Sequence, residues 1–449
     1  MSFHRDPAMD HLNNHETTNK YCYCKDFREQ AGQCLICREL AQGHDYRTPN
    51  AHALDTFRVA VTGSNGKTTV TNLLGRVLAS VGGNQVGFAS TTGIYRGQKQ
   101  VFTYEHRASE HYTYLMNQPE ITTVVAEQPE AGLAKYGLPL DHHVGIVTNL
   151  VSDHLERPWV HSGLDDVFLI KSLIVRMALE QAIVSIDYEW SRRMVAVFDR
   201  GQCAVFGRDA AHVAAARAAG YHVTTVENGQ IVIYTPDERV ELGQVNEFLV
   251  TLRGILTHNI ENLLPVLSAL HQNERTAPRF DEYLSVLKAM PPSFELNPAR
   301  FNVLRYQDSL IVFDYAHNED GYRASLSALQ QLCRRLGGKR SVGLVAAAAD
   351  RSAETVRAIA EVIGNSLDDA YVRTIPGNAN SQRLADGLPK ASQGRMWDQG
   401  YRAFIEAHAR PDTIVYVTIA GHGHIQDLAT VVTELGLTDI AHEHLEELS

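Results

Sequence analysis

Gly66, Lys67 and Thr68 form the stretch whose residue types and spacing most clearly predict chemistry. A strand-like run at 57–61 precedes them and a helix-like run at 69–78 follows. In a loop of this kind, backbone N–H groups hold phosphate oxygens, the lysine adds positive charge, and the threonine hydroxyl can bind Mg²⁺. The stretch therefore predicts a site for a nucleoside triphosphate. The residues expected to bind it are Gly63, Ser64, Asn65, Gly66, Lys67, Thr68 and Thr69.

One position departs from the common form of this loop. The usual pattern places a glycine five residues before Gly66, but Val61 stands there, and Gly63 lies inside the loop instead. The alternative is an ordinary strand–turn–helix with a chance Gly-Lys-Thr. We favour the phosphate loop because the flanking strand and helix both match the context that the motif needs.

Three further side chains are candidates for the chemistry. Glu127 ends an apolar, strand-like run, where a carboxylate can hold Mg²⁺ opposite a phosphate loop, although it could equally start a helix. His154 follows Asp153 soon after another such run, and the pair could be metal ligands or only a helix cap. Lys171 lies on a helix expected over 164–179, and taken alone it would be a solvated surface lysine.

Four cysteines, Cys22, Cys24, Cys34 and Cys37, are clustered near the N-terminus. Four thiolates suit tetrahedral Zn²⁺, and such a cluster in an intracellular protein indicates metal more than disulfides. The first two are one residue apart rather than the more usual two, so free thiols in a loose arm are the alternative.

The composition bounds the class of protein. The chain has 449 residues, of which 44% are hydrophobic and 21% charged, which is typical of a globular protein with two or three domains. A net charge of -11 argues against a nucleic-acid partner. The sequence shows neither a run long enough to span a membrane nor an apolar signal core, so we expect a cytoplasmic protein without a membrane partner.

The elements that must position these groups alternate along most of the chain. Short apolar runs at 59–62, 85–89, 122–127 and 144–148 each end at a polar group, and helix-like stretches separate most of them. This alternation predicts a parallel sheet with crossover helices, in which ligands bind at the carboxyl ends of the strands.

A second alternation begins after a proline-containing boundary near 290–294. Its expected strands are 310–313, 342–346, 370–373 and 414–419, and its expected helices include 322–336 and 353–363. We therefore predict an α/β fold: a Cys- and His-rich arm over 1–54, a central P-loop-containing domain with a mainly parallel sheet over 55–295, and a smaller Rossmann-like α/β domain over 296–449.

Several motifs together resemble one family. They are Gly-Ser-Asn-Gly-Lys-Thr-Thr at 63–69, Glu127, Thr-Asn-Leu-x-x-Asp-His-Leu at 148–155, His-Asn-x-x-Asn at 258–262, Ala-Arg-Phe-Asn at 299–302 and Asp-Tyr-Ala-His-Asn at 314–318. Their order and spacing resemble the Mur ligase family, ATP-dependent ligases that form amide bonds in cell-wall precursors and related polymers. The resemblance covers 57–425. Within the family, Thr-Thr-Gly-Ile-Tyr-Arg-Gly at 91–97 is most similar to the Mur-ligase-like half of cyanophycin synthetase.

The resemblance implies a role for each matching position. The catalytic residues would be Lys67, Glu127, His154 and Lys171, with Lys67 on the ATP phosphates. Thr68, Glu127 and His154 would hold Mg²⁺. Lys171 would join them once carbamylated, because a carbamate offers oxygens to the ion whereas an ammonium repels it. The positions that match the adenine-side pair and the C-terminal residues closing over the nucleotide are Asn259, Asn262, Arg300, Asp314 and His317.

The implied activity is the phosphorylation of a substrate carboxylate by ATP, followed by attack of an amine on the acyl phosphate. The expected partners are small carboxylate and amine substrates, such as an amino acid or a peptide, with a protein partner or a homo-oligomer left open. Neither the sugar-nucleotide domain of the wall ligases nor the upstream ATP-using domain of cyanophycin synthetase is expected here. The segments 345–351 and 420–424 depart from the family pattern. The alternatives are an ATP-using subunit of a glutaminase-coupled amidating complex and a non-catalytic nucleotide-binding scaffold.

Overall fold

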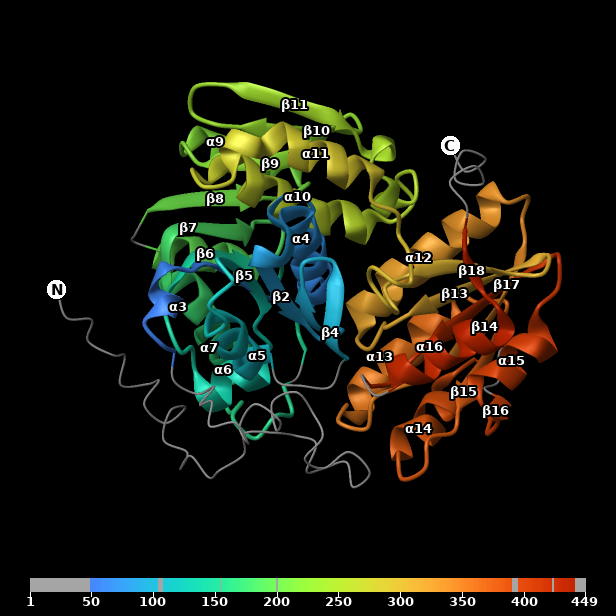
Figure 1. The fold of residues 1–449 in the computed structure, drawn as a ribbon. Helices are drawn as coiled ribbons and strands as arrows, with labels where there is room; N and C mark the ends of the chain where they lie inside the picture. The colour runs from blue at the N-terminus through green and yellow to red at the C-terminus, as the bar shows by residue number, and fades with distance from the viewer. Residues whose placement is uncertain are drawn as a thin grey trace. The chain divides into compact units, whose positions relative to one another are not determined.

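The computed structural model describes residues 49–103, 108–153, 155–198, 201–389, 395–421 and 424–440 (Figure 1). The chain divides into two compact units. The first comprises the chain up to Gly243 together with Glu261–Leu287, and the second comprises Gln244–Ile260 and the chain from Lys288 onward. Across the described ranges, no helix is long and apolar enough to cross a membrane.

The first unit is built on a sheet of eleven strands among the described residues, in the order β11-β10-β9-β8-β7-β6-β1-β5-β2-β3-β4. Its middle is parallel, as predicted. The parallel strands are β1 (Phe57–Thr62), β2 (Val86–Ser90), β5 (Thr123–Glu127), β6 (His142–Val147), β7 (Ala178–Ser185), β8 (Gln202–Phe206) and β9 (His222–Glu227). The outer strands are β3 (Gly93–Arg96), β4 (Lys99–Thr103), β10 (Gln230–Tyr234) and β11 (Arg239–Gln244).

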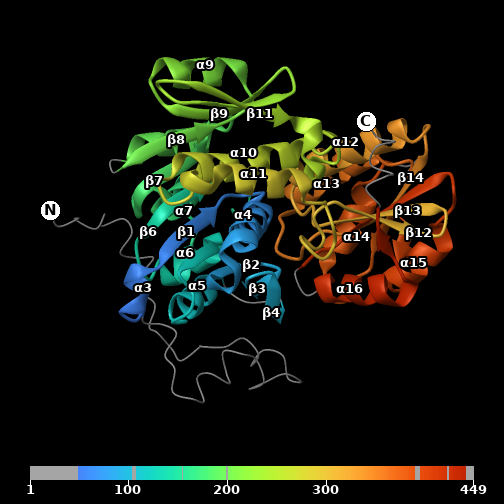
Figure 2. The ribbon, with the colours of Figure 1, turned by 45° about the horizontal axis from the view of Figure 1, so that its top comes forward.

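Helices cover both faces of this sheet (Figures 1 and 2). All six residues of β1 are buried, as expected for a strand that is covered on both faces and therefore reads as a continuous apolar run. The first helices are α3 (His52–Asp55), α4 (Lys67–Gly82), α5 (Ala108–Met116), α6 (Glu130–Tyr136) and α7 (Leu164–Arg176). They are followed by α8 (Glu189–Arg193), α9 (Ala210–Ala218), α10 (Thr257–Gln272) and α11 (Phe280–Ala289).

The second unit holds a seven-stranded sheet, counted over the described residues, in the order β16-β15-β14-β17-β13-β12-β18. The strands β13 to β17 run parallel, and β12 and β18 add an antiparallel edge. The strands are β12 (Asn302–Tyr306), β13 (Ser309–Asp314), β14 (Arg340–Val345), β15 (Asp369–Arg373), β16 (Arg395–Trp397), β17 (Thr413–Thr418) and β18 (Thr438–Asp439). The helices are α12 (Glu319–Arg335), α13 (Ala353–Gly364), α14 (Ala379–Gly387), α15 (Tyr401–His408) and α16 (His424–Leu435).

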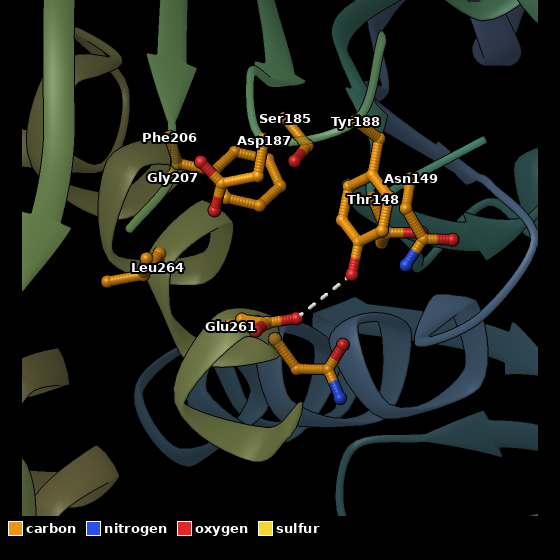
Figure 3. A pocket seen from close by; sticks show the side chains of 10 residues that line it. Thr148, Asn149, Ser185, Asp187, Tyr188, Phe206, Gly207, Glu261 and Leu264 are labelled. Carbon is orange, nitrogen blue, oxygen red and sulfur yellow. Dashed lines mark hydrogen bonds between the residues drawn. The ribbon is translucent and has the colours of Figure 1, made fainter. Parts of the chain in front are cut away.

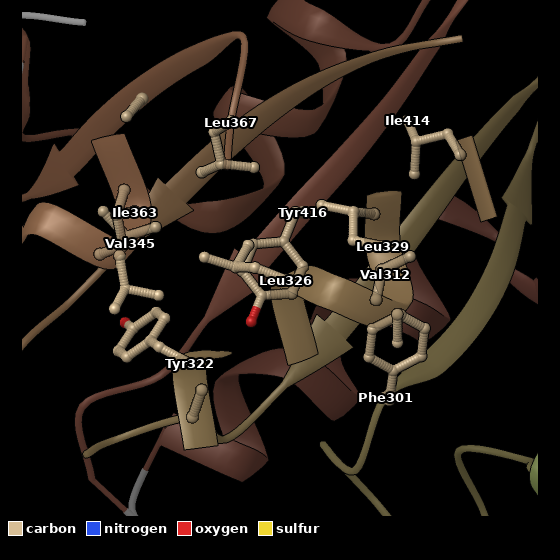
Figure 4. Packing of buried hydrophobic residues seen from close by; sticks show 14 of the residues in the cluster. Phe301, Val312, Tyr322, Leu326, Leu329, Val345, Ile363, Leu367, Ile414 and Tyr416 are labelled. Atoms are coloured by element: carbon tan, nitrogen blue, oxygen red, sulfur yellow. The ribbon is translucent and has the colours of Figure 1, made fainter. Parts of the chain in front are cut away.

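The core of the second unit contains two buried tyrosines that also use their hydroxyl groups (Figure 4). The Tyr322 hydroxyl donates to the carbonyl oxygen of Ala346 at 2.7 Å and lies 2.8 Å from Thr418 Oγ1. The Tyr416 hydroxyl lies 2.7 Å from Ser325 Oγ. A buried hydroxyl without a partner would be destabilising, so these bonds fix how α12 packs on β14 and β17.

One expected element ends earlier than predicted. The helix expected over 164–179 stops at Arg176, and β7 begins at Ala178. The residues between 173 and 182 are mostly apolar and contain neither glycine nor proline, so the sequence does not mark where the helical period gives way to a buried parallel strand.

Candidate functional site

The predicted phosphate-binding loop lies where β1 passes into α4. Gly66 stands before the helix in the left-handed region, with φ of 84°. A Cβ on Gly66 would lie 2.1 Å from Asn262 Oδ1, and a Cβ on Gly63 would lie 1.9 Å from Thr148 Oγ1. Both positions therefore need glycine, because a side chain would collide with the residues that enclose the loop.

The departure from the common motif at Val61 has a structural reason. Val61 is a fully buried residue of β1 and pairs in parallel register with Glu127 of β5 and Ile146 of β6. The strand therefore continues through the position where the common loop has already begun. The loop in this chain is shorter and starts at Gly63.

Asn149 and Ser64 hold the loop in shape. The backbone N–H of Ser64 donates to the Asn149 carbonyl oxygen at 2.9 Å and to its Oδ1 at 3.2 Å, and the N–H of Asn65 donates to the same Oδ1 at 2.8 Å. The Lys67 ammonium donates to the Ser64 carbonyl oxygen at 2.8 Å. The helix α4 begins directly after the loop, and the N-terminus of a helix, with its backbone N–H groups and the positive end of its dipole, favours a phosphate.

Thr68 and Glu127 come together beside the loop, as the motif match implies. The Thr68 hydroxyl donates to Glu127 Oε2 at 2.9 Å, and the carboxylate is buried at the end of β5. The backbone N–H of Thr91 also donates to Glu127 Oε2 at 2.9 Å, and its hydroxyl donates at 3.0 Å. A hydroxyl and a carboxylate are the oxygen ligands that Mg²⁺ prefers, so this pair fits the ion.

Thr91 was not predicted as a site residue, although a signal for it exists. It directly follows β2, and polar residues just after parallel strands are the usual ligand-facing positions. The same rule, which predicted Glu127 at the end of β5, could have found Thr91.

Lys171 is buried rather than a solvated surface lysine. Its side chain is 1% exposed, and its ammonium donates to Ser64 Oγ at 3.3 Å and lies 3.8 Å from Glu130 Oε2. The other carboxylate oxygen of Glu130 accepts the indole N–H of Trp159 at 3.1 Å. Glu130 and Trp159 were not predicted, because only the fold brings α6 and the 156–163 segment to Lys171.

Burial sets the pKa values of this pair. It lowers the pKa of Lys171 to about 8, because the charged ammonium loses water, and the negative charge of Glu130 only partly opposes the shift. Burial likewise raises the pKa of Glu130, partly offset by Lys171. A larger share of Lys171 is therefore neutral near pH 7 than for an exposed lysine.

A pocket open to solvent lies next to the loop in the first unit (Figure 3). The Tyr188 hydroxyl donates to Glu261 Oε2 at 3.3 Å across it. Asn262, predicted on the adenine side, lines this pocket, whereas Asn259 does not: its amide donates to the Val250 carbonyl oxygen at 2.8 Å in the second unit. The lining residues are Thr148, Asn149, Ser185, Asp187, Tyr188, Phe206, Gly207, Glu261, Asn262 and Leu264.

Arg300, Asp314 and His317 lie near one another in the second unit. The N–H of Phe301 donates to Asp314 Oδ1 at 3.0 Å, and the Arg300 guanidinium lies 4.9 Å from the centroid of the Tyr315 ring. His317 Nδ1 lies 3.1 Å from the Tyr315 carbonyl oxygen.

The residues on either side of Arg300 hold an uncommon backbone conformation. Ala299 and Phe301 have φ of 54° and 52°, in the left-handed region that residues other than glycine rarely occupy. Strain of this kind persists where the surrounding structure fixes it, and it gives Arg300 a defined place.

The remaining predicted ligands lie outside the described residues. These are His154 and the clustered Cys22, Cys24, Cys34 and Cys37, and their roles stay predictions. Within the part of the chain that the structure describes, no group of three or more His, Cys, Asp or Glu side chains could hold a metal ion.

Comparison with known proteins assigns the chain to a family. A model of the Mur ligase middle domain matches residues 61–270, and a model of the Mur ligase, glutamate ligase domain matches residues 299–421. The two matches cover the central sheet with its phosphate loop and most of the second unit. The chain belongs to the Mur ligase family, which confirms the resemblance seen in its motifs.

Individual relatives agree with this assignment. Cyanophycin synthetase of Geminocystis herdmanii is 24% identical over 360 residues, which are 77% of this chain but only 39% of that protein. UDP-N-acetylmuramoyl-L-alanyl-D-glutamate--2,6-diaminopimelate ligase of Corynebacterium efficiens is 29% identical over 398 residues, 82% of this chain and 70% of that protein. The structure of E. coli FolC in complex with DHPP and ADP matches with a TM-score of 0.63 at 16% identity, covering 87% of this chain and 90% of that one, which confirms the predicted α/β fold.

Proposed function

We propose that this chain is an ATP-dependent ligase that joins a carboxylate to an amine through an acyl phosphate. The observation that supports this most is the convergence on one loop of two lysines: the ammonium of Lys67 and that of Lys171 both donate to Ser64. The Thr68–Glu127 pair lies at the start of the helix that follows. Relatives named as a synthetase and as a ligase, and a related structure that holds ADP, support the same chemistry.

In this proposal the chain positions charged groups rather than supplying a nucleophile. Transfer of the γ-phosphoryl group spreads negative charge over its oxygens, and Lys67, which now bonds to the loop carbonyl, turns to meet that charge. The pocket lined by Asn262 receives the adenine base of ATP. Thr68 and Glu127, with His154 and a carbamylated Lys171, would hold Mg²⁺, which neutralises phosphate charge. Arg300, Asp314 and His317 are proposed as ATP contacts on their motif match alone.

The lowered pKa of Lys171 supports its carbamylation. Carbamate formation needs the neutral amine: a bond forms from Nζ to the carbon of CO₂, and one proton leaves the nitrogen. At a pKa of about 8, roughly one lysine in ten is neutral at pH 7. An exposed lysine would be neutral roughly once in a few thousand molecules.

The experiment is phosphate release from ATP and Mg²⁺ with a panel of amino acids, dipeptides and ammonia. Release that requires both an added carboxylate and an added amine supports the proposal, and Lys67→Met should abolish it, whereas Lys99→Met on exposed β4 should not. Release that requires ammonia or a glutaminase partner supports an amidating complex. If the chain binds ATP but no acceptor stimulates phosphate release, both the ligase and the amidating complex are rejected, and the non-catalytic nucleotide-binding scaffold remains.

A separate proposal concerns the N-terminal cysteines. We propose that Cys22, Cys24, Cys34 and Cys37 bind one Zn²⁺ as thiolates, in a cytoplasmic location where thiols stay reduced and ATP is supplied. Metal analysis of the purified chain should give one zinc per molecule, and Cys34→Ser with Cys37→Ser should remove it. Four freely titrating thiols without zinc would contradict the assignment.

A further inference from the structure

The segment 91–97 resembles the Mur-ligase-like half of cyanophycin synthetase, but the site described above uses only its first residue, Thr91. Thr91 and Thr92 form the turn between β2 and β3, and Tyr95 is the third residue of β3. The side chains of Thr92 and Tyr95 are 0% and 2% exposed. Because buried hydroxyl groups need hydrogen-bond partners, the bonds that these two hydroxyls make indicate their role.

The Thr92 hydroxyl is the centre of a buried hydrogen-bond network in the first unit. Its Oγ1 lies 3.0 Å from the Tyr95 hydroxyl, 3.2 Å from Asn72 Nδ2 and 2.8 Å from Ser90 Oγ. Ser90 Oγ in turn donates to Asn72 Oδ1 at 2.8 Å and accepts from the backbone N–H of Thr92 at 3.2 Å. Asn72 and Ser90 are each 1% exposed, so the network relies on protein partners rather than on bulk water.

The number of available protons fixes the direction of each bond in this network. Ser90 has one hydroxyl proton, which goes to Asn72, so the proton between Ser90 and Thr92 comes from Thr92. The two lone pairs of the Thr92 hydroxyl then accept from Asn72 and Tyr95. Every donor and acceptor site of the Thr92 hydroxyl is therefore used, and a fully satisfied buried network of this kind is rigid.

The network joins this turn to the helix that begins at the phosphate-binding loop. Asn72 is on α4, four residues after Thr68, so the two side chains lie on the same face of that helix. Asn72 bonds to the turn, and Thr68 bonds to Glu127. Thr91, in the same turn, also donates to Glu127. Hydrogen bonds therefore lead from α4 to the turn, from the turn to Glu127, and from Glu127 back to α4.

This closed ring of bonds affects the two carboxylate oxygens of Glu127 unequally. Oε2 accepts from the Thr68 hydroxyl at 2.9 Å, from the backbone N–H of Thr91 at 2.9 Å and from the Thr91 hydroxyl at 3.0 Å. Among the described residues, Oε1 has only the same Thr91 hydroxyl, at 3.1 Å, which has a single proton to share. Oε1 is therefore the oxygen with lone pairs left for a cation, and its direction depends on where the turn holds Thr91.

We propose that Asn72, Thr92 and Tyr95 are positioning residues of the Mg²⁺ site, which fix the turn so that Thr91 holds the Glu127 carboxylate in one orientation. This inference rests on the proposed function. Side chains that orient a metal ligand typically change metal affinity by about ten- to a hundredfold when they are replaced. Replacing these three residues should therefore weaken the binding of nucleotide with Mg²⁺ and leave the binding of metal-free nucleotide nearly unchanged.

The test is isothermal titration calorimetry of ADP on the full-length chain, with and without Mg²⁺, together with thermal unfolding of each variant. Thr92→Val removes the central hydroxyl at nearly constant volume, whereas Thr92→Ser keeps it. Tyr95→Phe removes one donor and keeps the ring, whose centroid lies 4.5 Å from that of Phe88. Thr276→Val is the matched control, because Thr276 is a 4% exposed residue of the first unit whose hydroxyl donates to the Ala269 carbonyl oxygen at 2.9 Å.

We expect Thr92→Val to weaken the binding of ADP by about tenfold or more with Mg²⁺ and by less than about threefold without it. Tyr95→Phe should weaken the binding with Mg²⁺ by about three- to tenfold, and Thr92→Ser should stay within about threefold of the wild type. Thr276→Val should keep both affinities even where it lowers the unfolding midpoint as much as Thr92→Val does. In the Glu127→Gln variant, adding Tyr95→Phe should cause no further loss, since the carboxylate that the network positions is absent.

Three results would overturn the inference. They are an equal effect of Thr92→Val on ADP binding with and without Mg²⁺, a loss of affinity in Thr92→Ser as large as in Thr92→Val, or an effect of Tyr95→Phe that is as large in Glu127→Gln as in the wild type. Tyr95→Phe, which keeps the ring, keeps the test decisive if Thr92→Val does not fold. Each of these results would leave the Mg²⁺ dependence of ADP binding in the wild type intact, whereas a wild-type chain without that dependence would reject the metal site and the proposed ligase function with it.

Discussion

The buried pair of Lys171 and Glu130 makes a prediction that needs no knowledge of the substrate. Lys171→Met keeps an apolar stem but removes the charge that faces Glu130 Oε2. The Glu130 carboxylate would then keep the indole N–H of Trp159 as its donor among the described residues. A buried carboxylate without its counter-charge is destabilising, because little water remains to solvate it.

The size of the expected loss in unfolding free energy follows from the distance between the two charged groups. Removing one partner of a buried ion pair costs about 3–5 kcal/mol, and the 3.8 Å separation of these two atoms favours the lower end, about 3 kcal/mol. For a domain of this size, that loss lowers the unfolding midpoint by roughly 6–12 °C.

The loss should depend on pH. Without Lys171, the pKa of Glu130, which burial already raises above 4.5, rises further. A group whose pKa is raised in the folded state stabilises fully below its unfolded value and loses that contribution as pH rises through the folded value. The loss should therefore grow as pH rises through the folded pKa of Glu130 and should be larger at pH 7 than at pH 5. Above pH 7 it should shrink again, because wild-type Lys171, whose pKa is about 8, loses its own charge.

The assay is thermal unfolding at pH 5 and pH 7, in buffer free of bicarbonate, of Lys171→Met, Glu130→Gln and the double variant, with Lys99→Met as the control. At pH 7 the double variant should recover most of the stability that Lys171→Met loses, while both remain inactive in phosphate release. A double variant as unstable as Lys171→Met, or a loss that is equal at both pH values, would refute the reasoning.

Three further changes have defined outcomes. Glu127→Gln should weaken the binding of ADP in the presence of Mg²⁺ by at least about tenfold, as measured by calorimetry. Binding of ADP without Mg²⁺ should change by less than about threefold. Equal effects under the two conditions would show that Glu127 does not bind the metal. Gly66→Ala places a Cβ 2.1 Å from Asn262 Oδ1 and should weaken the binding of ADP by more than about tenfold. Gly163→Ala, with φ of 65° and nothing within 4 Å of its Cβ, should leave ADP binding unchanged. Similar losses of affinity in both variants would show that the contact with Asn262 is not the cause. Asn380→Ala removes the amide that donates to the carbonyls of Ala348 and Arg351 and should lower the free energy of unfolding by about 2 kcal/mol. Gln382→Ala, an exposed change on the same helix, should lower it by less than about 0.5 kcal/mol. Denaturant titration of both variants measures the difference.

The parallel core of both units could be predicted because its central strands, such as β1, β6, β13 and β17, are buried at every residue. The expected runs at 59–62, 122–127 and 144–148 correspond to β1, β5 and β6, which lie next to one another in the sheet. The antiparallel β3 and β4 were not predicted, since β3 has only four residues and β4 is largely exposed, so neither gives a continuous apolar run.

The residues of the candidate site also fall into two groups, those that the sequence predicts and those that it does not. Thr68 could be predicted because it follows Gly66 and Lys67 in the phosphate-binding motif, and Glu127 because it is the polar residue that ends an apolar strand. Glu130 and Trp159 could not, because what brings them to Lys171 is the packing of α6 and α7, and no spacing in the sequence encodes that contact. Their burial, and the pKa shifts that follow from it, are properties of the folded chain alone.

The bonds that shape the phosphate-binding loop also constrain how the protein is made. Ser64 contacts Asn149, 85 positions later in the chain, and Lys171, 107 positions later. Contacts so distant close late, because the intervening chain must first be ordered. A growing chain that has passed Thr69 therefore contains the whole motif but not yet the loop, and a fragment that ends before β6 would contain the motif without the partners that fix its form. In the proposed function, the chain would therefore bind ATP only after β6 and α7 have joined the fold.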